Sequence, residues 1–199
     1  MSKKTTPLQT YEIYNHKILW GAARRNLVLA QGPAKKDQMF WALGSMILTY
    51  CAFEGYLNWL GASIDPVVWK DERSFFSRSP YQGTTGKYIY LSKILCLAVP
   101  DFSKEPSQTV KALTTLRNMS VHPKAEKGSR SAKLKKGSLP TPYISALEKR
   151  VSPKKAKRAL KHIKQLCGEL HKEARVLHHG IITGKEPFDG IIGFESGDA

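Results

Sequence analysis

The chain has 199 residues, of which 41% are hydrophobic, and it carries a formal net charge of +16 with a pI near 9.8. This hydrophobic share is enough for one folded domain with a core, and it excludes a fibrous or disordered class. The strong positive balance indicates an anionic partner, with nucleic acid favoured over a membrane surface. We therefore expect a single basic globular domain.

The cysteines and the first residues bear on the compartment. Cys51, Cys96 and Cys167 lie in apolar contexts typical of helices, without C-x-x-C spacing or a nearby histidine pattern. They predict buried, reduced thiols, and we expect no metal and no cofactor. The basic N-terminus does not lead into an apolar signal core, so the sequence predicts a cytoplasmic protein.

Apolar periodicity, proline and glycine divide the first hundred residues into helices and one loop. The pattern predicts helices over residues 8–29, 38–62, 66–76 and 87–99. Residues 77–86, S-R-S-P-Y-Q-G-T-T-G, predict a loop by composition. The glycines of this loop do not match a phosphate-binding loop, because no G-K-S/T follows at the required spacing.

The helix expected over residues 38–62 is apolar on nearly every face and has one charged residue, Glu54. Its length would allow a transmembrane span, but a carboxylate at the centre of a bilayer costs about 2.5 to 3.5 kcal/mol. Asn58, Thr49 and Ser45 would also lie in hydrocarbon. We therefore expect a central bundle helix, buried between its neighbours or at a dimer interface.

The second half of the chain predicts three more helices. One begins near Pro106 and ends at His122, and a glycine-, serine- and lysine-rich connector follows over residues 123–140. Short and long helices are expected over residues 141–151 and 153–183, the second with a clear apolar stripe. Since no segment predicts a strand, we expect an all-α bundle over residues 1–183 and a flexible tail over residues 184–199.

A short motif, R-N-x-x-x-H, closes the helix that precedes Pro123. Because Pro123 disfavours the α conformation of the residue before it, the helix is expected to end at His122. The imidazole of His122 can then turn back toward the guanidinium of Arg117, an arrangement that suits phosphate chemistry. The alternative is structural: an arginine salt-bridged across the bundle and a histidine capping the helix C-terminus.

This motif, in a basic and all-helical chain, resembles the signature of the HEPN family over roughly residues 8–183. The resemblance implies a compact helical bundle, usually dimeric, and in many members a metal-independent endoribonuclease of toxin-antitoxin or phage-defence systems. It implies that His122 acts as general base or acid on the ribose 2'-hydroxyl and that Arg117 holds the phosphate. It further implies that Asn118 orients the histidine or the phosphate, and that an antitoxin or defence protein is a partner.

Glu54 is the expected partner of Arg117. A lone carboxylate in an apolar helix is costly unless it is paired, and Arg117 is the best cation on a core-bearing helix to pair with it. The hypothesis is that Glu54 orients Arg117. The alternative is that Glu54 points to solvent at a bend beside Gly55.

Positive charge is concentrated after the motif, with 14 lysines and arginines against 2 glutamates between Pro123 and Lys164. A lysine-rich loop beside the motif would bind RNA phosphates with a steep salt dependence. The alternative is a solvated basic linker. The residues expected to bind RNA are Lys124, Lys127, Arg130, Lys133, Lys135 and Lys136.

The other histidines give no site. His16, His178 and His179 lack partners at ligand spacing, and His162 and His171 are expected on the basic, exposed side of the last helix. Two further functions remain open besides a nuclease. One is a non-catalytic HEPN-like RNA-binding or adaptor protein, and the other is a DNA-binding regulator, which lacks a recognisable helix-turn-helix.

Overall fold

The structure is a computed structural model that describes residues 14–123, 125, 144–182 and 185–188. The described residues form eight α-helices and one 3₁₀ turn, and no strand occurs among them. The all-α fold predicted from the sequence is therefore confirmed.

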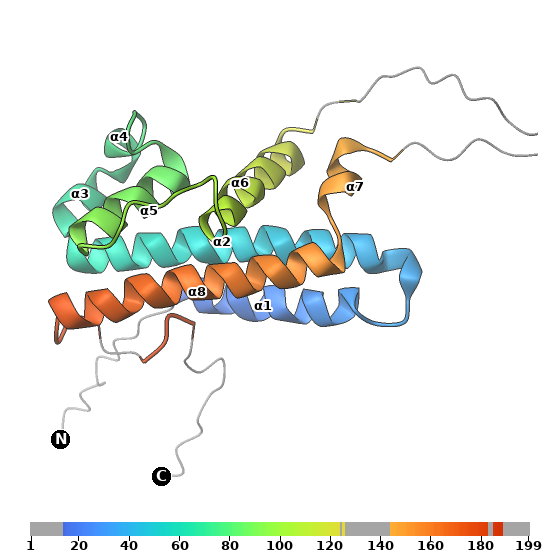
Figure 1. Cartoon of the computed structure of the whole chain (residues 1–199), viewed down its shortest axis with the longest axis horizontal. Helices are drawn as coiled ribbons and strands as arrows, with labels where there is room; N and C mark the ends of the chain where they lie inside the picture. Colours follow the sequence, from blue (N-terminus) through green and yellow to red (C-terminus); the bar gives the residue numbers. More distant parts are fainter. Residues whose placement is uncertain (1–13, 124, 126–143, 183–184, 189–199) are drawn as a thin grey trace, which may run out of the picture.

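Three long helices lie side by side and make the base of the fold (Figure 1). Helices α1 (Asn15–Ala30) and α2 (Gln38–Ile64) form an antiparallel hairpin, joined through the 3₁₀ turn η1 (Lys35–Asp37). Helix α8 (Pro153–Leu177) packs against both and runs in the same direction as α2. The shorter helices cover the remaining side of α2.

Helix α2 is the centre of the core, because it contacts α1, α3, α5, α6 and α8. Its buried residues are distributed around the helix, and several have no exposed surface: Ala42, Ala52, Phe53, Tyr56, Leu57 and Leu60. This agrees with the prediction of a central bundle helix. None of the helices in the described residues is both long enough and apolar enough to cross a membrane.

After α2 the chain turns at Asp65, the N-cap residue of the next helix. Asp65 Oδ1 accepts a hydrogen bond from the backbone N–H of Val68 at 3.3 Å, and proline occupies the first position of α3 (Pro66–Lys70). A single helix over residues 66–76 was expected here. The structure has instead two short helices, because the chain breaks at Asp71 before α4 (Glu72–Phe75).

Helix α5 (Gly83–Ile94) begins four residues earlier than the predicted helix over residues 87–99 and also ends earlier. Gly83 has φ +63°, a conformation that glycine adopts without strain, and this turns the chain into the helix. Gly86 lies against the backbone of Tyr81, where a Cβ would come within 1.8 Å of the carbonyl carbon. Cys96 then has φ 57° and ends the segment. Cys96 is exposed and Cys51 is half-buried, so the prediction of three buried cysteines is confirmed only for Cys167.

Helix α6 (Ser107–Val121) carries the R-N-x-x-x-H motif and ends one residue before His122, close to the predicted end. The next described helix, α7 (Ala146–Arg150), is shorter than the predicted helix over residues 141–151. It begins with a capping box in which Ser145 and Glu148 each bond the other's backbone N–H.

The apolar stripe predicted for the last helix is confirmed in α8. The helix is shorter than predicted, since it ends at Leu177 and not at residue 183. One side is buried at a spacing of three and four residues: Ala156, Ala159, Leu160, Ile163, Leu166, Cys167, Leu170 and Ala174. Leu177, the last residue of α8, is half exposed. The burial of this stripe fixes which side of α8 faces solvent.

An aromatic cluster joins the first and last described segments. Phe188 is buried and stacks on Trp20 with ring centroids 4.1 Å apart, so the expectation of a flexible tail does not extend to this residue. His16 lies in the same cluster, near Tyr56 and Trp59, with 3% of its surface exposed. Its Nε2 atom has no hydrogen-bond partner in the described part of the chain. Burial lowers the pKa of His16 to about 4.

The close approach at Gly86 predicts a stability difference between two glycine substitutions. A Gly86→Ala variant is expected to lose about 1 to 3 kcal/mol of unfolding free energy, since its Cβ would overlap the Tyr81 backbone. The matched control is Gly168→Ala in α8, where a Cβ meets nothing within 4 Å, and a gain of about 0.5 to 1 kcal/mol is expected. Urea unfolding followed by circular dichroism measures both, and equal stabilities would contradict the packing described here.

The buried His16 predicts a loss of stability in mild acid. In the unfolded chain its pKa is near 6.5, so between pH 6.5 and about 4 the unfolded state binds a proton that the folded state excludes. The unfolding free energy is therefore expected to fall by about 3 kcal/mol over this range. A His16→Phe variant removes this titration while keeping a ring in the cluster. Denaturation at pH 7, 5.5 and 4.5 should show a smaller acid loss in the variant, and equal losses would refute the assignment.

Candidate functional site

The motif lies at the C-terminal end of α6, which is anchored to the core by one side. Leu113 and Leu116 are each 1% exposed and hold α6 against the bundle. Arg117 follows at the edge of this buried side and is half-buried, whereas Asn118 and His122 are exposed. The helix therefore presents the motif at the boundary between core and solvent.

Asn118 links the two ends of the motif. Its side-chain Oδ1 accepts a hydrogen bond from Arg117 Nη1 at 3.3 Å, and its backbone carbonyl accepts one from the N–H of His122 at 3.0 Å. His122 has φ −121° and ψ 62°, so the chain leaves the helix there, as expected before Pro123. Within the described residues, no hydrogen bond or ion pair uses the His122 side chain. The His122 side chain is exposed.

Glu54 enters a chain of hydrogen bonds between α2 and α5. Thr84 Oγ1 donates to Glu54 Oε1 at 2.8 Å, and the hydroxyls of Tyr50 and Thr84 lie 2.7 Å apart. Burial raises the pKa of the Tyr50 phenol, and the Glu54 carboxylate adds to this rise while the Arg117 guanidinium opposes it. Both charges are therefore within electrostatic range of Tyr50. Among the described residues, however, no ion pair of 4 Å or less joins Glu54 to Arg117.

The structure thus brings Arg117 and Asn118 into contact and places Glu54 nearby without direct pairing. The half-buried, hydrogen-bonded Glu54 also differs from the alternative of a carboxylate turned to solvent. The sequence did not predict that Tyr50 and Thr84 belong to this group, because the composition around Thr84 predicts a loop.

A second polar contact follows one turn along α2, where Asn58 Oδ1 accepts a hydrogen bond from the buried Lys87 ammonium at 2.7 Å.

Cys51 lies beside this group but is a poor nucleophile. Burial raises the pKa of its thiol, and the nearby Glu54 carboxylate raises it further. A thiol with a raised pKa is protonated at neutral pH, and the thiolate is the reactive form. Cysteine-based covalent catalysis is therefore not supported at this position.

The six residues predicted to bind RNA, Lys124 to Lys136, all lie outside the described residues. The described part of the basic region comprises α7 and the first half of α8, and four of its lysines lie on the outer side of α8. Lys154, Lys157, Lys161 and Lys164 are exposed and spaced by three or four residues, so they share one side of the helix. No aspartate or glutamate occurs between residues 153 and 168, which makes this side uniformly positive.

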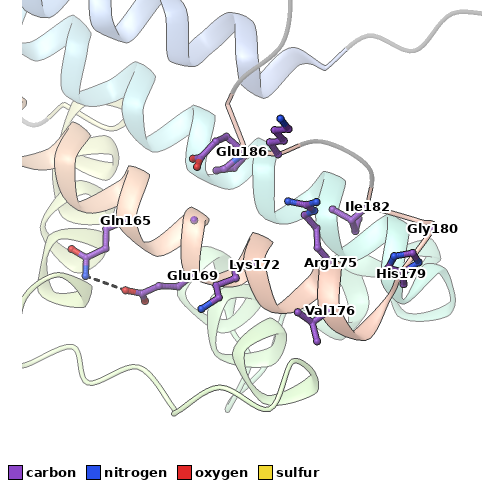
Figure 2. Close-up of a pocket in the computed structure, with 12 residues that line it drawn as sticks. Gln165, Glu169, Lys172, Arg175, Val176, His179, Gly180, Ile182 and Glu186 are labelled. Atoms are coloured by element: carbon purple, nitrogen blue, oxygen red, sulfur yellow. Dashed lines mark hydrogen bonds between the residues drawn. The ribbon is translucent and has the colours of Figure 1, made fainter.

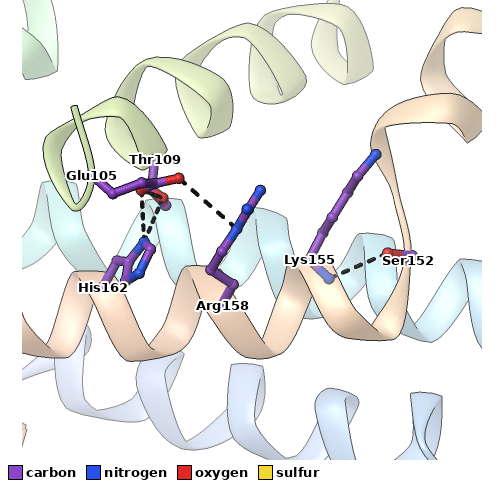
Figure 3. A network of polar contacts seen from close by, with 6 residues as sticks. All are labelled: Glu105, Thr109, Ser152, Lys155, Arg158 and His162. Carbon is purple, nitrogen blue, oxygen red and sulfur yellow. Dashed lines mark hydrogen bonds and ion pairs between the residues drawn. The ribbon is translucent and has the colours of Figure 1, made fainter. Parts of the chain in front are cut away.

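The prediction that His162 and His171 lie on the exposed side of α8 is wrong. His171 is 2% exposed and its Nδ1 lies 3.3 Å from the Tyr56 hydroxyl. His162 Nδ1 lies 2.8 Å from Glu105 Oε2 and 2.8 Å from Thr109 Oγ1, and Arg158 completes the group (Figure 3).

The His162 group does not have the geometry of a nucleophilic triad. In such a triad the carboxylate and the hydroxyl contact opposite nitrogens of the imidazole. Here both Glu105 and Thr109 contact the same nitrogen, and Thr109 also donates to Glu105 at 2.6 Å. The arrangement instead ties the start of α6 to α8, which fixes the position of the motif helix.

A wide hollow of about 960 Å³ lies at the end of α8, away from the motif (Figure 2). It is lined by side chains of both signs, among them Glu169, Lys172, Arg175 and Glu186. None of the predicted catalytic residues reaches it. Across the described residues, no group of three or more histidine, cysteine, aspartate or glutamate side chains is arranged to hold a metal ion.

Comparison with known proteins gives no family assignment: no family model, no curated protein and no solved structure matches the chain.

The bridge made by Thr84 predicts a cost for removing its hydroxyl. Thr84 is 5% exposed and bonds both Tyr50 and Glu54, so Thr84→Val is expected to lower the unfolding free energy by about 1 to 3 kcal/mol. The control is Thr85→Val, one residue on, whose hydroxyl bonds only the exposed Gln82 carbonyl. Equal effects of the two substitutions in denaturant titrations would mean that the bridge does not contribute.

Proposed function

We propose that the chain is a metal-independent endoribonuclease of a toxin-antitoxin or phage-defence type. The observation that supports this most directly is the end of α6, where Asn118 bonds Arg117 through its side chain and His122 through its carbonyl. A cation held at the edge of the core and an exposed imidazole then share one helix end. The HEPN resemblance of the R-N-x-x-x-H motif supports the same function.

In the proposed reaction, His122 takes the proton of a ribose 2'-hydroxyl, and the 2'-oxygen attacks the adjacent phosphorus. The bond from phosphorus to the 5'-oxygen breaks, and this oxygen takes a proton from a protonated imidazole. In a dimer, this donor would be His122 of a second copy. The products are a 2',3'-cyclic phosphate and a 5'-hydroxyl. Arg117 would stabilise the negative charge that builds on the phosphate oxygens.

Asn118 and Glu54 have supporting roles in this proposal. Asn118 limits the rotation of Arg117 by accepting one of its hydrogen bonds. Glu54 would orient Arg117 through its charge, without a direct ion pair, while Thr84 holds the carboxylate in place. A homodimer and a neutralising antitoxin or defence partner belong to the same proposal, since the family resemblance implies both.

A cleavage assay tests this function with purified full-length chain, labelled single-stranded RNA and EDTA. Cleavage with cyclic phosphate ends is expected, and His122→Ala should reduce the rate by about 10² to 10⁴, the usual contribution of general acid-base catalysis. Arg117→Ala should give a comparable loss. The control is His179→Ala, which removes an exposed histidine at the far end of α8 and should cleave like the wild type. Cleavage that survives His122→Ala would exclude the proposed mechanism.

The alternative proposal is a non-catalytic RNA-binding or adaptor protein. The uniformly positive outer side of α8 favours it, because those lysines can bind phosphates without any contribution from His122. The same assay separates the two functions. RNA binding that weakens steeply with salt, without cleavage by the wild type, would support the adaptor.

A further inference from the structure

A small cavity of about 140 Å³ lies on the α8 side of the motif helix, between α2, α6, α7 and α8. Its apolar floor comes from five side chains, of which four are buried and Ala112 is exposed: Met46, Ala112, Leu113, Leu116 and Ala159. An apolar cavity of about 150 Å³ is large enough to take up benzene. The floor is therefore suited to a flat aromatic group.

Three cations stand at the same cavity: Arg150 at the end of α7 and Lys155 and Arg158 in the first turns of α8. Figure 3 shows Lys155 and Arg158 rising from α8 on the same side, toward α7 and α6. The cavity lining contains no aspartate or glutamate. A small apolar cavity with this charge favours a ligand that joins a ring to an anionic group.

The three cations keep hydrogen-bonding capacity for such a group. Lys155 donates to the carbonyl of Lys149, which leaves two of its three N–H bonds. Arg158 pairs weakly with Glu105, because its Nε lies 3.9 Å from the carboxylate and both side chains are partly exposed. Arg150 makes no hydrogen bond or ion pair through its side chain with any described residue. Two guanidinium groups and an ammonium suit the oxygens of a phosphate.

We propose that this cavity is a nucleotide-binding site, in which the base occupies the apolar floor and the phosphate contacts Arg150, Lys155 and Arg158. The site is separate from Arg117 and His122, and binding there needs no cleavage. The same chemistry is present in a free nucleoside monophosphate and in a nucleotide of an RNA strand.

Met46 provides a direct reporter, because it lines the cavity and the chain has only four methionines. With methyl-labelled methionine in the full chain, AMP is expected to shift the Met46 methyl resonance and to leave those of Met39 and Met119 in place. Assignment uses Met46→Leu. Adenosine lacks the phosphate and ribose 5-phosphate lacks the base. The affinity of each should be lower than that of AMP by about ten-fold or by a larger factor.

Charge-neutralising variants test the rim of the cavity. Arg150→Gln and Lys155→Gln should each weaken AMP binding by about ten-fold, the cost of losing one charge-assisted hydrogen bond. The matched control is Lys172→Gln, which removes the same charge from α8 outside the cavity and should change the affinity by less than about two-fold. A second variant, Ala112→Leu, fills the floor from an exposed position and should abolish the Met46 shift while the three cations remain.

A short single-stranded RNA, tested on the His122→Ala background to prevent cleavage, distinguishes the source of the ligand. A Met46 shift with RNA and not with AMP would support the site with an RNA strand as its ligand, and a shift with AMP would support a free nucleotide. The proposal is overturned if neither ligand shifts Met46. It is also overturned if Lys155→Gln and Lys172→Gln bind the ligand with equal affinity.

Discussion

The structure depends on one constraint, which is that α2 must be covered on nearly every side. Phe53, Tyr56, Leu57 and Leu60 have no exposed surface, and their burial requires α1, α8 and the shorter helices together. Burial of side chains of this size contributes about 1.5 to 3 kcal/mol each. The single carboxylate of α2, Glu54, is accommodated through its bond to Thr84 of α5. The covering of α2 therefore also sets where the polar residues of the candidate site can lie.

Strong local patterns predicted the main elements of this fold. The apolar run that ends at Asp65 and Pro66 defined α2, and the spacing of the α8 stripe defined its buried side. The start of α5 could not be predicted in this way, because Gly83 and Gly86 read as loop residues. The turn into α5 depends on the positive φ of Gly83, and the place of Gly86 depends on its contact with the Tyr81 backbone. Neither follows from local sequence.

In the candidate site, too, the contacts within one stretch of chain could be predicted and those between distant residues could not. Pro123 predicted the end of α6, and the link from Asn118 to Arg117 lies within one stretch of chain. Thr84 is 30 residues from Glu54, so their bond could not be predicted from local pattern. The burial of His171 did have a signal: it follows Ile163 and Cys167 at helical spacing on the buried stripe. The basic residues around it led to the wrong assignment.

Helices α2 and α8 pack together although they lie far apart along the chain, and this has a consequence for synthesis of the chain. Helix α2 ends at residue 64 and α8 ends at residue 177, so 113 further residues must be translated before this cover is complete. At translation rates of about 5 to 20 residues per second, the gap corresponds to roughly 6 to 23 seconds. During that interval the uncovered side of α2 is a hydrophobic surface available to chaperones on the ribosome.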